Sequence, residues 1–302
     1  MFNISKKRVF FKKYQIKKLI CKTPLSELYE GINIKDNELI AIKIEQQNKN
    51  KNYNLLESEA YFLLNLKGFG IPKLISYGTS NGYNVLIEEL LGPSIKLLWN
   101  LRNNTNKKVL IKDICMLSIQ ILNLLEYIHS KDVIHRDIKP ENFLIGRKDP
   151  TTIYLNNFGL ARKYRSSRTG KHIKYNIIKK AYGTIRYMSR NANKGYELSR
   201  RDDLESFGYM IIDLAKNDLP WINLEKSNLE KIKIIKEIYN LKNSVTSEQI
   251  CKNLPEEFNH IIKYIRNLEF EQNPDYSYLK GLFLSVLSRN LQKNDLLKKK
   301  RK

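Results

Sequence analysis

The alternation of hydrophobic and polar residues changes along the chain. Residues 39–45 (LIAIKIE) alternate, so that the three isoleucines share one face while Ala41 and Lys43 share the other. This period of two residues predicts a strand that presents a lysine side chain. A second strand is predicted at residues 83–89 (YNVLIEE), and it is followed by residues 90–93 (LLGP), where Gly and Pro interrupt the pattern.

A helical pattern dominates the chain after this interruption. Apolar residues recur at steps of three and four in one long segment, which predicts a helix with a buried stripe. The stripe consists of Leu110, Ile114, Leu117, Ile121, Leu125 and Ile128. Further helices are predicted within residues 203–214 and 229–238. The predicted fold class is therefore α+β, with a strand-rich lobe (1–91), a helical lobe (92–287) and a basic tail (288–302), whose last residues 296–302 (LLKKKRK) are expected to be disordered.

Composition narrows the class of protein. With 302 residues, of which 42% are hydrophobic, the chain is long enough for one large domain or two lobes that share a core. Lys and Arg number 54 against 31 Asp and Glu, and the resulting charge of +23 favours anionic partners over cationic ones. A composition rich in Lys, Asn and Ile accounts for most of this surplus without any selected partner.

The cysteines and the apolar segments indicate in which cellular compartment the protein is expected. Cys21, Cys115 and Cys251 lack metal-ligand spacing, and their odd number argues against a disulfide framework, so a reducing interior is expected. Residues 1–14 lack the apolar core of a signal peptide, and no apolar run approaches the roughly 20 residues that span a bilayer. We therefore expect a soluble intracellular protein without membrane contact.

The strongest chemical signal lies in residues 135–142 (HRDIKPEN), which have the spacing of a protein-kinase catalytic loop. In that chemistry Asp137 orients the substrate hydroxyl and accepts its proton, Lys139 neutralises charge on the migrating phosphoryl group, and Asn142 ligates a metal ion. Residues 157–159 (NFG) begin fifteen positions after Asn142. This separation suits a hairpin that returns both asparagines to one cleft.

These residues give the chain a resemblance to protein kinases, and further segments narrow it to the casein kinase I family. The segments that carry the resemblance are residues 128–144 (IHSKDVIHRDIKPENFL), 70–78 (GIPKLISYG), 89–94 (ELLGPS), 199–209 (SRRDDLESFGY), 219–221 (LPW) and 274–279 (PDYSYL). They run from the first lobe nearly to the tail. The resemblance implies a bilobal kinase fold that uses ATP and Mg²⁺.

The resemblance also assigns roles to single residues. Lys43 resembles the lysine that pairs with the ATP phosphates, and Glu57 resembles the helix glutamate that holds this lysine, with Glu59 as the alternative. Asp203 resembles the aspartate that braces the catalytic loop from beneath. The remaining assignments are Ala41, Glu89, Leu91 and Leu144 around adenine, with the hinge at 89–91, and Asn142 and Asn157 around Mg²⁺.

Two departures from the family are expected to lower the affinity for ATP and Mg²⁺. Kinases cover the phosphates with a Gly-x-Gly-x-x-Gly hairpin, but here Cys21, Thr23 and Ser26 stand in place of the glycines, and Pro24 removes a backbone donor. Asn157 replaces the carboxylate that bridges Mg²⁺ to the phosphates. Its amide oxygen brings no negative charge, so metal affinity is expected to fall.

Two pocket positions are also altered. Glu88 stands where the family has an apolar gatekeeper, and Asn156 stands where an aliphatic residue is usual. A buried unpaired glutamate is costly. Glu88 is therefore expected either to find a donor such as Lys43, which would take that lysine from ATP, or to reach solvent.

The family resemblance implies substrates that are acidic or already phosphorylated. Arg186 matches an arginine of the family's basic docking site, and Lys179 and Lys180 precede it, so these cations are expected to bind a phosphate or carboxylate. A further lysine of that site is displaced, because Ile232 occupies the gap-free position. The lysines are also explained by a solvated basic face.

Three functional hypotheses follow. The first is a monomeric Ser/Thr protein kinase of the casein kinase I type with reduced efficiency, and the second is a pseudokinase scaffold that binds partners without phosphoryl transfer. The third hypothesis is that the basic surface binds nucleic acid, but the sequence contains no RNA- or DNA-recognition motif that supports it. The tail 298–302 (KKKRK) is either a nuclear import signal or a solubilising tail, so nucleus and cytoplasm both stay open.

Overall fold

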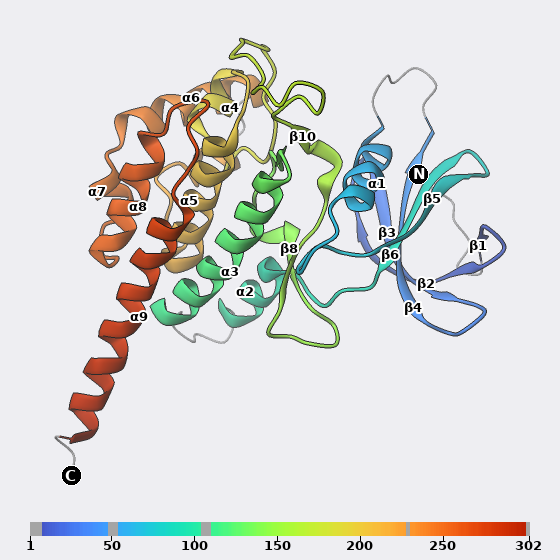
Figure 1. Cartoon of the computed structure of the whole chain (residues 1–302), viewed down its shortest axis with the longest axis horizontal. Coiled ribbons are helices and arrows are strands. Elements are labelled where there is room, and N and C mark those ends of the chain that lie inside the picture. The colour runs from blue at the N-terminus through green and yellow to red at the C-terminus, as the bar shows by residue number, and fades with distance from the viewer. Residues whose placement is uncertain (1–7, 48–53, 104–109, 228–229, 300–302) are drawn as a thin grey trace. The chain divides into compact units, whose positions relative to one another are not determined.

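The computed structural model describes residues 8–47, 54–103, 110–227 and 230–299. The chain folds into two compact units (Figure 1). A strand-rich unit comprises Met1–Ser94 and Phe143–Ala161, and a helical unit comprises Ile95–Asn142 and Arg162–Lys302. The strand-rich unit thus includes a second, later segment that the sequence analysis places in the helical lobe.

The strand-rich unit is built on an antiparallel six-stranded sheet with the order β1-β2-β3-β4-β6-β5. Its strands are β1 (Val9–Phe10), β2 (Tyr14–Lys22), β3 (Ser26–Asn33), β4 (Leu39–Gln46), β5 (Leu74–Ser80) and β6 (Tyr83–Glu89). The other elements of this unit are helix α1 (Leu55–Asn65), the hairpin of β8 (Phe143–Ile145) and β9 (Ile153–Leu155), and the short 3-10 turn η2 (Phe158–Leu160).

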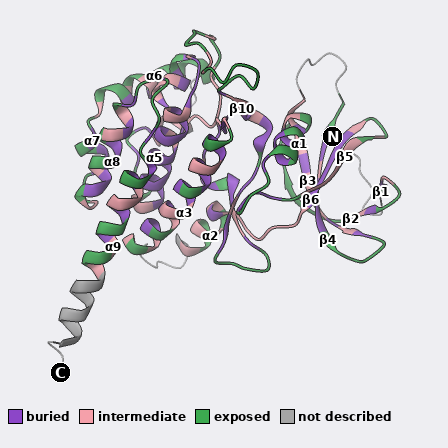
Figure 2. Ribbon diagram, in the orientation of Figure 1, coloured by how far each residue is buried: buried purple, intermediate pink, exposed green. Residues whose placement is uncertain are grey.

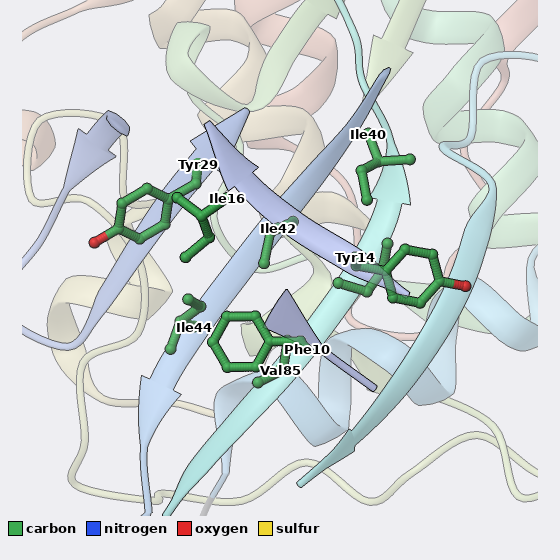
Figure 3. Close-up of a cluster of buried hydrophobic side chains, with 9 residues drawn as sticks. Phe10, Tyr14, Ile16, Tyr29, Ile40, Ile42, Ile44 and Val85 are labelled. Carbon is green, nitrogen blue, oxygen red and sulfur yellow. The ribbon is translucent and has the colours of Figure 1, made fainter. Parts of the chain in front are cut away.

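The two strands predicted at residues 39–45 and 83–89 are β4 and β6, and both are confirmed. The isoleucines of β4 lie in a buried apolar cluster that also contains residues of the first three strands (Figure 3). In the register of β4 with β6, Ala41 lies opposite Glu88 and Lys43 lies opposite Leu86. Lys43 and Glu88 therefore project from the same face of neighbouring strands, away from the isoleucines.

Among the described residues, the helical unit contains eight α-helices and two short 3-10 turns. They are α2 (Ile95–Asn103), α3 (Ile111–Ser130), η1 (Pro140–Asn142), α4 (Arg190–Lys194), α5 (Arg200–Lys216), η3 (Leu224–Lys226), α6 (Lys231–Ser244), α7 (Ser247–Ile250), α8 (Glu256–Arg266) and α9 (Tyr276–Lys299). A small two-stranded sheet joins β7 (Val133–Ile134) to β10 (Arg162–Lys163).

The core of the helical unit is formed by α3 and α5, which are buried over much of their length (Figure 2). Four residues of the stripe predicted for α3 are buried, namely Ile114, Ile121, Leu125 and Ile128. Leu110 instead precedes the helix as its N-cap and is 47% exposed. No helix in the described part of the chain combines the length and apolarity that crossing a membrane requires.

The end of the chain differs from the prediction of a disordered tail. Helix α9 continues to Lys299, and residues 300–302 of the KKKRK segment lie outside the described residues. Residues 288–299 contain Leu, Gln, Lys and Arg, which favour a helix, beside Ser288, Asn290, Asn294 and Asp295, and they contain neither Gly nor Pro. No strong helix breaker therefore ends α9 before Lys299.

Candidate active site

Lys43 forms the centre of a polar cluster in the strand-rich unit. Its Nζ lies 2.6 Å from Oε1 of Glu59, 3.0 Å from Oε1 of Glu88 and 3.1 Å from Oδ1 of Asn156. An ammonium group has three N–H donors, and these three acceptors match that number. A phosphate that approaches Lys43 must therefore displace one of them.

The predicted pairing of Lys43 with Glu57 is wrong, and Glu59 takes this place. Glu57 is exposed in the first turn of α1, where its backbone N–H donates to Oδ1 of the N-cap Asn54 at 3.1 Å. Glu59 lies on the buried face of the helix and is 1% exposed. Two residues correspond to about 200° of rotation around a helix, so the two glutamates point to nearly opposite sides.

Glu88 was predicted either to find a donor such as Lys43 or to reach solvent, and the structure shows the contact with Lys43. Its side chain is buried, and its Oε1 pairs with Lys43 and accepts a hydrogen bond from Nδ2 of Asn156 at 2.9 Å. Its Oε2 is also buried and has no hydrogen-bond partner among the described residues. Asn156, which the sequence analysis noted only as an altered position, thus bridges the lysine and this glutamate.

The cluster holds two carboxylates against one ammonium group. Burial disfavours the charge on Lys43, but the attraction of Glu59 and Glu88 outweighs it and raises the lysine pKa to about 12. For Glu59, burial and the neighbouring charge of Glu88 raise the pKa despite the opposing effect of Lys43. Lys43 therefore stays protonated, and the surplus negative charge falls on the glutamates.

The turn between β2 and β3 has no free amides to offer to phosphate. Oγ1 of Thr23 accepts hydrogen bonds from the backbone N–H groups of Ser26 at 2.9 Å and Leu25 at 3.3 Å. The N–H of Thr23 itself donates to the carbonyl of Ser26 at 2.8 Å. Pro24 has no N–H. The predicted hairpin exists, but its donors are used within the turn.

Asn157 follows the β8–β9 hairpin, which confirms the connection predicted after Asn142. Its backbone is left-handed, with φ 68° and ψ 59°, and its N–H donates to Oδ1 of Asn156 at 2.6 Å. As magnesium ligands, Asn142 and Asn157 supply neutral amide oxygens where Mg²⁺ prefers carboxylates. The described residues also contain no group of three or more His, Cys, Asp or Glu that could hold a metal. Taken singly, each of these amide oxygens fits Mg²⁺ less well than a carboxylate would.

The remaining residues assigned to adenine belong to the strand-rich unit. Ala41 is buried on β4, whereas Leu91 and Leu144 are partly buried. Glu89 ends β6, and its side-chain Oε1 accepts a hydrogen bond from the backbone N–H of Lys73 at 2.8 Å. This bond fixes the start of the segment 89–91 against Lys73, the residue before β5.

The helical unit gathers Asp137 and Lys139 with a third residue that the sequence analysis missed. Thr184 Oγ1 donates to Oδ1 of Asp137 at 2.8 Å, and Lys139 Nζ lies 2.8 Å from Oδ2 of Asp137 and 3.0 Å from Thr184 Oγ1. Asn142 Nδ2 donates to the carbonyl of Asp137 at 2.7 Å. Asp137 is 6% exposed, so its carboxylate is held in one orientation.

Gly183 explains how Thr184 reaches the loop. Its φ of +103° is strained for residues with a side chain, and a Cβ at this position would lie 2.8 Å from the carbonyl oxygen of Arg136. In the sequence, the pair Gly183-Thr184 of residues 183–187 (GTIRY) is the feature that could have indicated this contact, because a glycine before a hydroxyl residue permits a close approach of the backbone.

Asp203 supports the catalytic loop as predicted. Its Oδ2 accepts the N–H of His135 at 2.7 Å, and its Oδ1 accepts the N–H of Arg136 at 2.8 Å. His129, which the sequence analysis missed, places Nε2 3.0 Å from Oδ2 of Asp203. Burial by itself would raise the pKa of Asp203. The interactions of its carboxylate with His129 and His135 outweigh burial and hold this pKa below its usual range.

Arg186 differs from the free cation that the sequence predicts. Its Nε and Nη2 both lie 2.8 Å from Oε2 of Glu225, and its Nη1 lies 3.3 Å from Oδ2 of Asp213. The guanidinium is therefore neutralised within the chain. Lys179 is exposed, and its backbone has a positive φ of 51°. Ile232 is 80% exposed, and the two lysines that flank it, Lys231 and Lys233, are exposed as well.

A comparison with known families completes the assignment. A family model described as protein kinase domain matches residues 14–277, which covers both the Lys43 cluster and the Asp137 cluster. This match confirms the kinase fold, with a strand-rich N-terminal sheet and a helical C-terminal region. The chain belongs to the protein kinase domain family.

Proposed function

We propose that the protein is a Ser/Thr protein kinase of the casein kinase I type, which transfers the γ-phosphate of ATP to acidic or phosphorylated proteins with weakened activity. The observation that carries this proposal is the Asp137 cluster, in which a buried carboxylate is held by Thr184 and Lys139. Catalysis of phosphoryl transfer depends on prepositioned groups of this kind, so the cluster has the parts that the reaction needs.

The roles of the residues follow from the charges that the reaction moves. Asp137 would accept a hydrogen bond from the substrate hydroxyl and take its proton as the new oxygen–phosphorus bond forms. The bond between the γ-phosphorus and the β-phosphate oxygen breaks, and ADP leaves with the electron pair. Lys139 would balance the negative charge of the migrating group. Mg²⁺, when bound, adds positive charge between the phosphates.

Weakened activity is supported by the strand-rich unit. Three acceptors within the chain already contact Lys43. The backbone amides of the turn at Thr23 already donate hydrogen bonds within the turn, and Asn157 has no charge to attract Mg²⁺. Each feature lowers the affinity for nucleotide or metal without touching the Asp137 cluster. The proposed preference for acidic substrates is supported by the exposed Lys179 and by the charge of +23, whereas Arg186 contributes only when it leaves Glu225.

A pseudokinase scaffold is the second candidate, and the Lys43 cluster favours it. Two carboxylates and an amide already occupy the lysine that an active kinase would direct at the nucleotide phosphates. In that case Asp137 and Lys139 serve only to hold the loop. An intracellular, monomeric protein is expected under both candidates.

Transfer of labelled phosphate from ATP to an acidic protein substrate tests the proposal. The wild type is compared with Asp137→Asn and with Glu141→Gln, a matched control because Glu141 is an exposed acidic residue of the same loop. The kinase predicts transfer by the wild type and by Glu141→Gln, and none by Asp137→Asn. Equal background labelling by all three proteins, with unchanged folding, would establish the scaffold instead.

A further inference from the structure

A basic cavity lies inside the helical unit. Its volume is about 180 Å³, and its walls come from α4, α5, α6 and α8. Helix α4 contacts α5 and α6, and α5 contacts α8. The charged residues that line it are Arg190, Lys194, Arg201, Arg266 and Glu205. Four cations thus share the cavity with one carboxylate. None of the cations assigned above to catalysis or substrate binding is among the lining residues.

The single carboxylate of the cavity is already occupied. Oε1 of Glu205 accepts hydrogen bonds from Nε of Arg190 at 2.9 Å and from the hydroxyl of Tyr209 at 2.6 Å. Glu205 is 4% exposed, so it is fixed in the wall and balances only one of the four positive charges. The nearest carboxylate to Arg201 is that of Asp202, at 3.9 Å from Nε, beyond hydrogen-bond distance.

The other guanidinium groups bond to neutral acceptors. Arg266 donates to the carbonyl oxygens of Val245 at 2.9 Å and Lys242 at 2.9 Å, and Arg201 donates to that of Leu268 at 3.1 Å. Carbonyl oxygens satisfy N–H donors without cancelling their charge. The cavity therefore keeps an excess of positive charge that the described residues do not neutralise.

Donors also remain for a ligand. Nη1 of Arg190 and Nη2 of Arg201 make no hydrogen bond with the described residues, and these side chains are 27% and 17% exposed. Lys194 is exposed, and its ammonium lies 5.0 Å from the ring centroid of Tyr239, another lining residue, without a hydrogen bond to the described part of the chain. These cations approach one space from different helices.

We propose that this cavity binds a phosphate group, either as free phosphate or as the phosphorylated side chain of a protein. A tetrahedral dianion accepts hydrogen bonds from several directions, and guanidinium groups match its oxygen pairs. The cavity volume is several times the roughly 30 Å³ that one water occupies in the liquid, so a polyatomic anion fits. The proposal does not rest on phosphoryl transfer by this protein.

Titration of the full-length protein with inorganic phosphate, followed by calorimetry, tests the site. The informative variant is Lys194→Glu, which reverses an exposed charge at the cavity, and Lys252→Glu is the matched control, because Lys252 is an exposed lysine of the same unit that does not line the cavity. We expect Lys194→Glu to weaken phosphate binding at least tenfold and Lys252→Glu to change it less than twofold. Equal affinities of the two variants, or no saturable binding to the wild type, would overturn the proposal.

A second control separates this cavity from the catalytic loop. Lys139→Gln removes the ammonium beside Asp137 and is expected to bind phosphate like the wild type; loss of binding in this variant would place the phosphate at the catalytic loop and overturn the proposal. A phosphoserine peptide and its unphosphorylated form then distinguish the sources. Competition between the phosphoserine peptide and inorganic phosphate supports a protein-borne ligand, whereas binding of phosphate alone supports the free anion.

Discussion

Nζ of Lys43 lies 3.0 Å from Oε1 of Glu88, on the strand that pairs directly with the strand of the lysine. Glu88 therefore competes with nucleotide phosphate for the donors of Lys43. Because a hydrogen bond to a charged group contributes about 1.5–3 kcal/mol, we expect Glu88→Met to tighten ATP binding by about tenfold or more. Calorimetric titration with ATP measures the change.

The matched variant for this experiment is Glu88→Gln, which keeps the shape of the side chain and removes its charge. It is expected to give an intermediate affinity, because the amide oxygen still accepts from Lys43. If Glu88→Met folds with an unchanged melting temperature and binds ATP no more tightly than the wild type, Glu88 does not restrain the lysine.

Glu59 and Glu57 offer a direct comparison on one helix. Glu59→Gln weakens a buried ion pair, whereas Glu57→Gln alters an exposed residue whose role at the helix start is carried by its backbone N–H. We expect Glu59→Gln to lower the free energy of unfolding by about 2 kcal/mol, and Glu57→Gln to change it by less than about 0.5 kcal/mol. Urea unfolding monitored by fluorescence measures both, and equal effects would contradict the assignment of Glu59.

Asn157 sits in a left-handed conformation that Asp also tolerates. Asn157→Asp is therefore expected to fold normally and to restore a negative charge for Mg²⁺. The thermal shift produced by ATP should then depend more strongly on magnesium than in the wild type. Asn157→Ala is the control without a metal ligand, and its melting temperature without ATP is measured separately, because Ala tolerates the left-handed conformation less well than Asn or Asp. No gain for Asn157→Asp would mean that this position does not contact the metal.

Local periodicity predicted the parts of the fold that local forces determine. The alternation at 39–45 gave β4 because its isoleucines face the core, and the step of three and four residues gave α3. The resemblance placed Glu57 before Glu59, although Glu59 is the residue that pairs with Lys43. The rotational phase of α1, where Leu56 and Leu63 share the buried side with Glu59, is the better guide.

Long-range pairings were outside the reach of these patterns. Glu225 lies 39 positions after Arg186 in the sequence, and nothing in either segment indicates that their side chains meet. Thr184 reaches Asp137 across 47 positions for the same reason. Sequence motifs therefore predicted which residues carry the chemistry, whereas the tertiary structure shows which of these charges are already paired within the chain.

The pairing of Arg186 with Glu225 gives a prediction about substrates. Glu225→Gln leaves the guanidinium with only Asp213 as an anionic partner among the described residues, so Arg186 becomes more available to a phosphate on the substrate. We expect KM for a prephosphorylated peptide to fall by about threefold to tenfold, with kcat little changed. Steady-state kinetics measure the change, with Glu256→Gln as a control at an exposed glutamate of α8. An unchanged KM would show that Arg186 does not contact the substrate.

Lys242 is fully buried in α6, and its Nζ donates to the carbonyls of Ile185 and Met188 and to Oδ1 of Asn193. It forms no ion pair with the described residues. Burial therefore lowers its pKa to about 7, against about 10.4 in an unfolded chain. Between these values the unfolded chain binds more protons than the folded chain, so the contribution of Lys242 to stability rises with pH through this window.

We therefore expect the stability advantage of the wild type over Lys242→Met to grow between about pH 7 and about pH 9. Urea unfolding at both pH values measures this difference, and the comparison cancels other groups that titrate in the same range. Lys242→Met is also expected to cost about 3 kcal/mol near neutral pH, because the buried carbonyls of Ile185 and Met188 lose their donor. Lys252→Met, at an exposed site, should follow the wild type at every pH. Parallel pH profiles for Lys242→Met and the wild type would show that the buried amine does not change its protonation on folding.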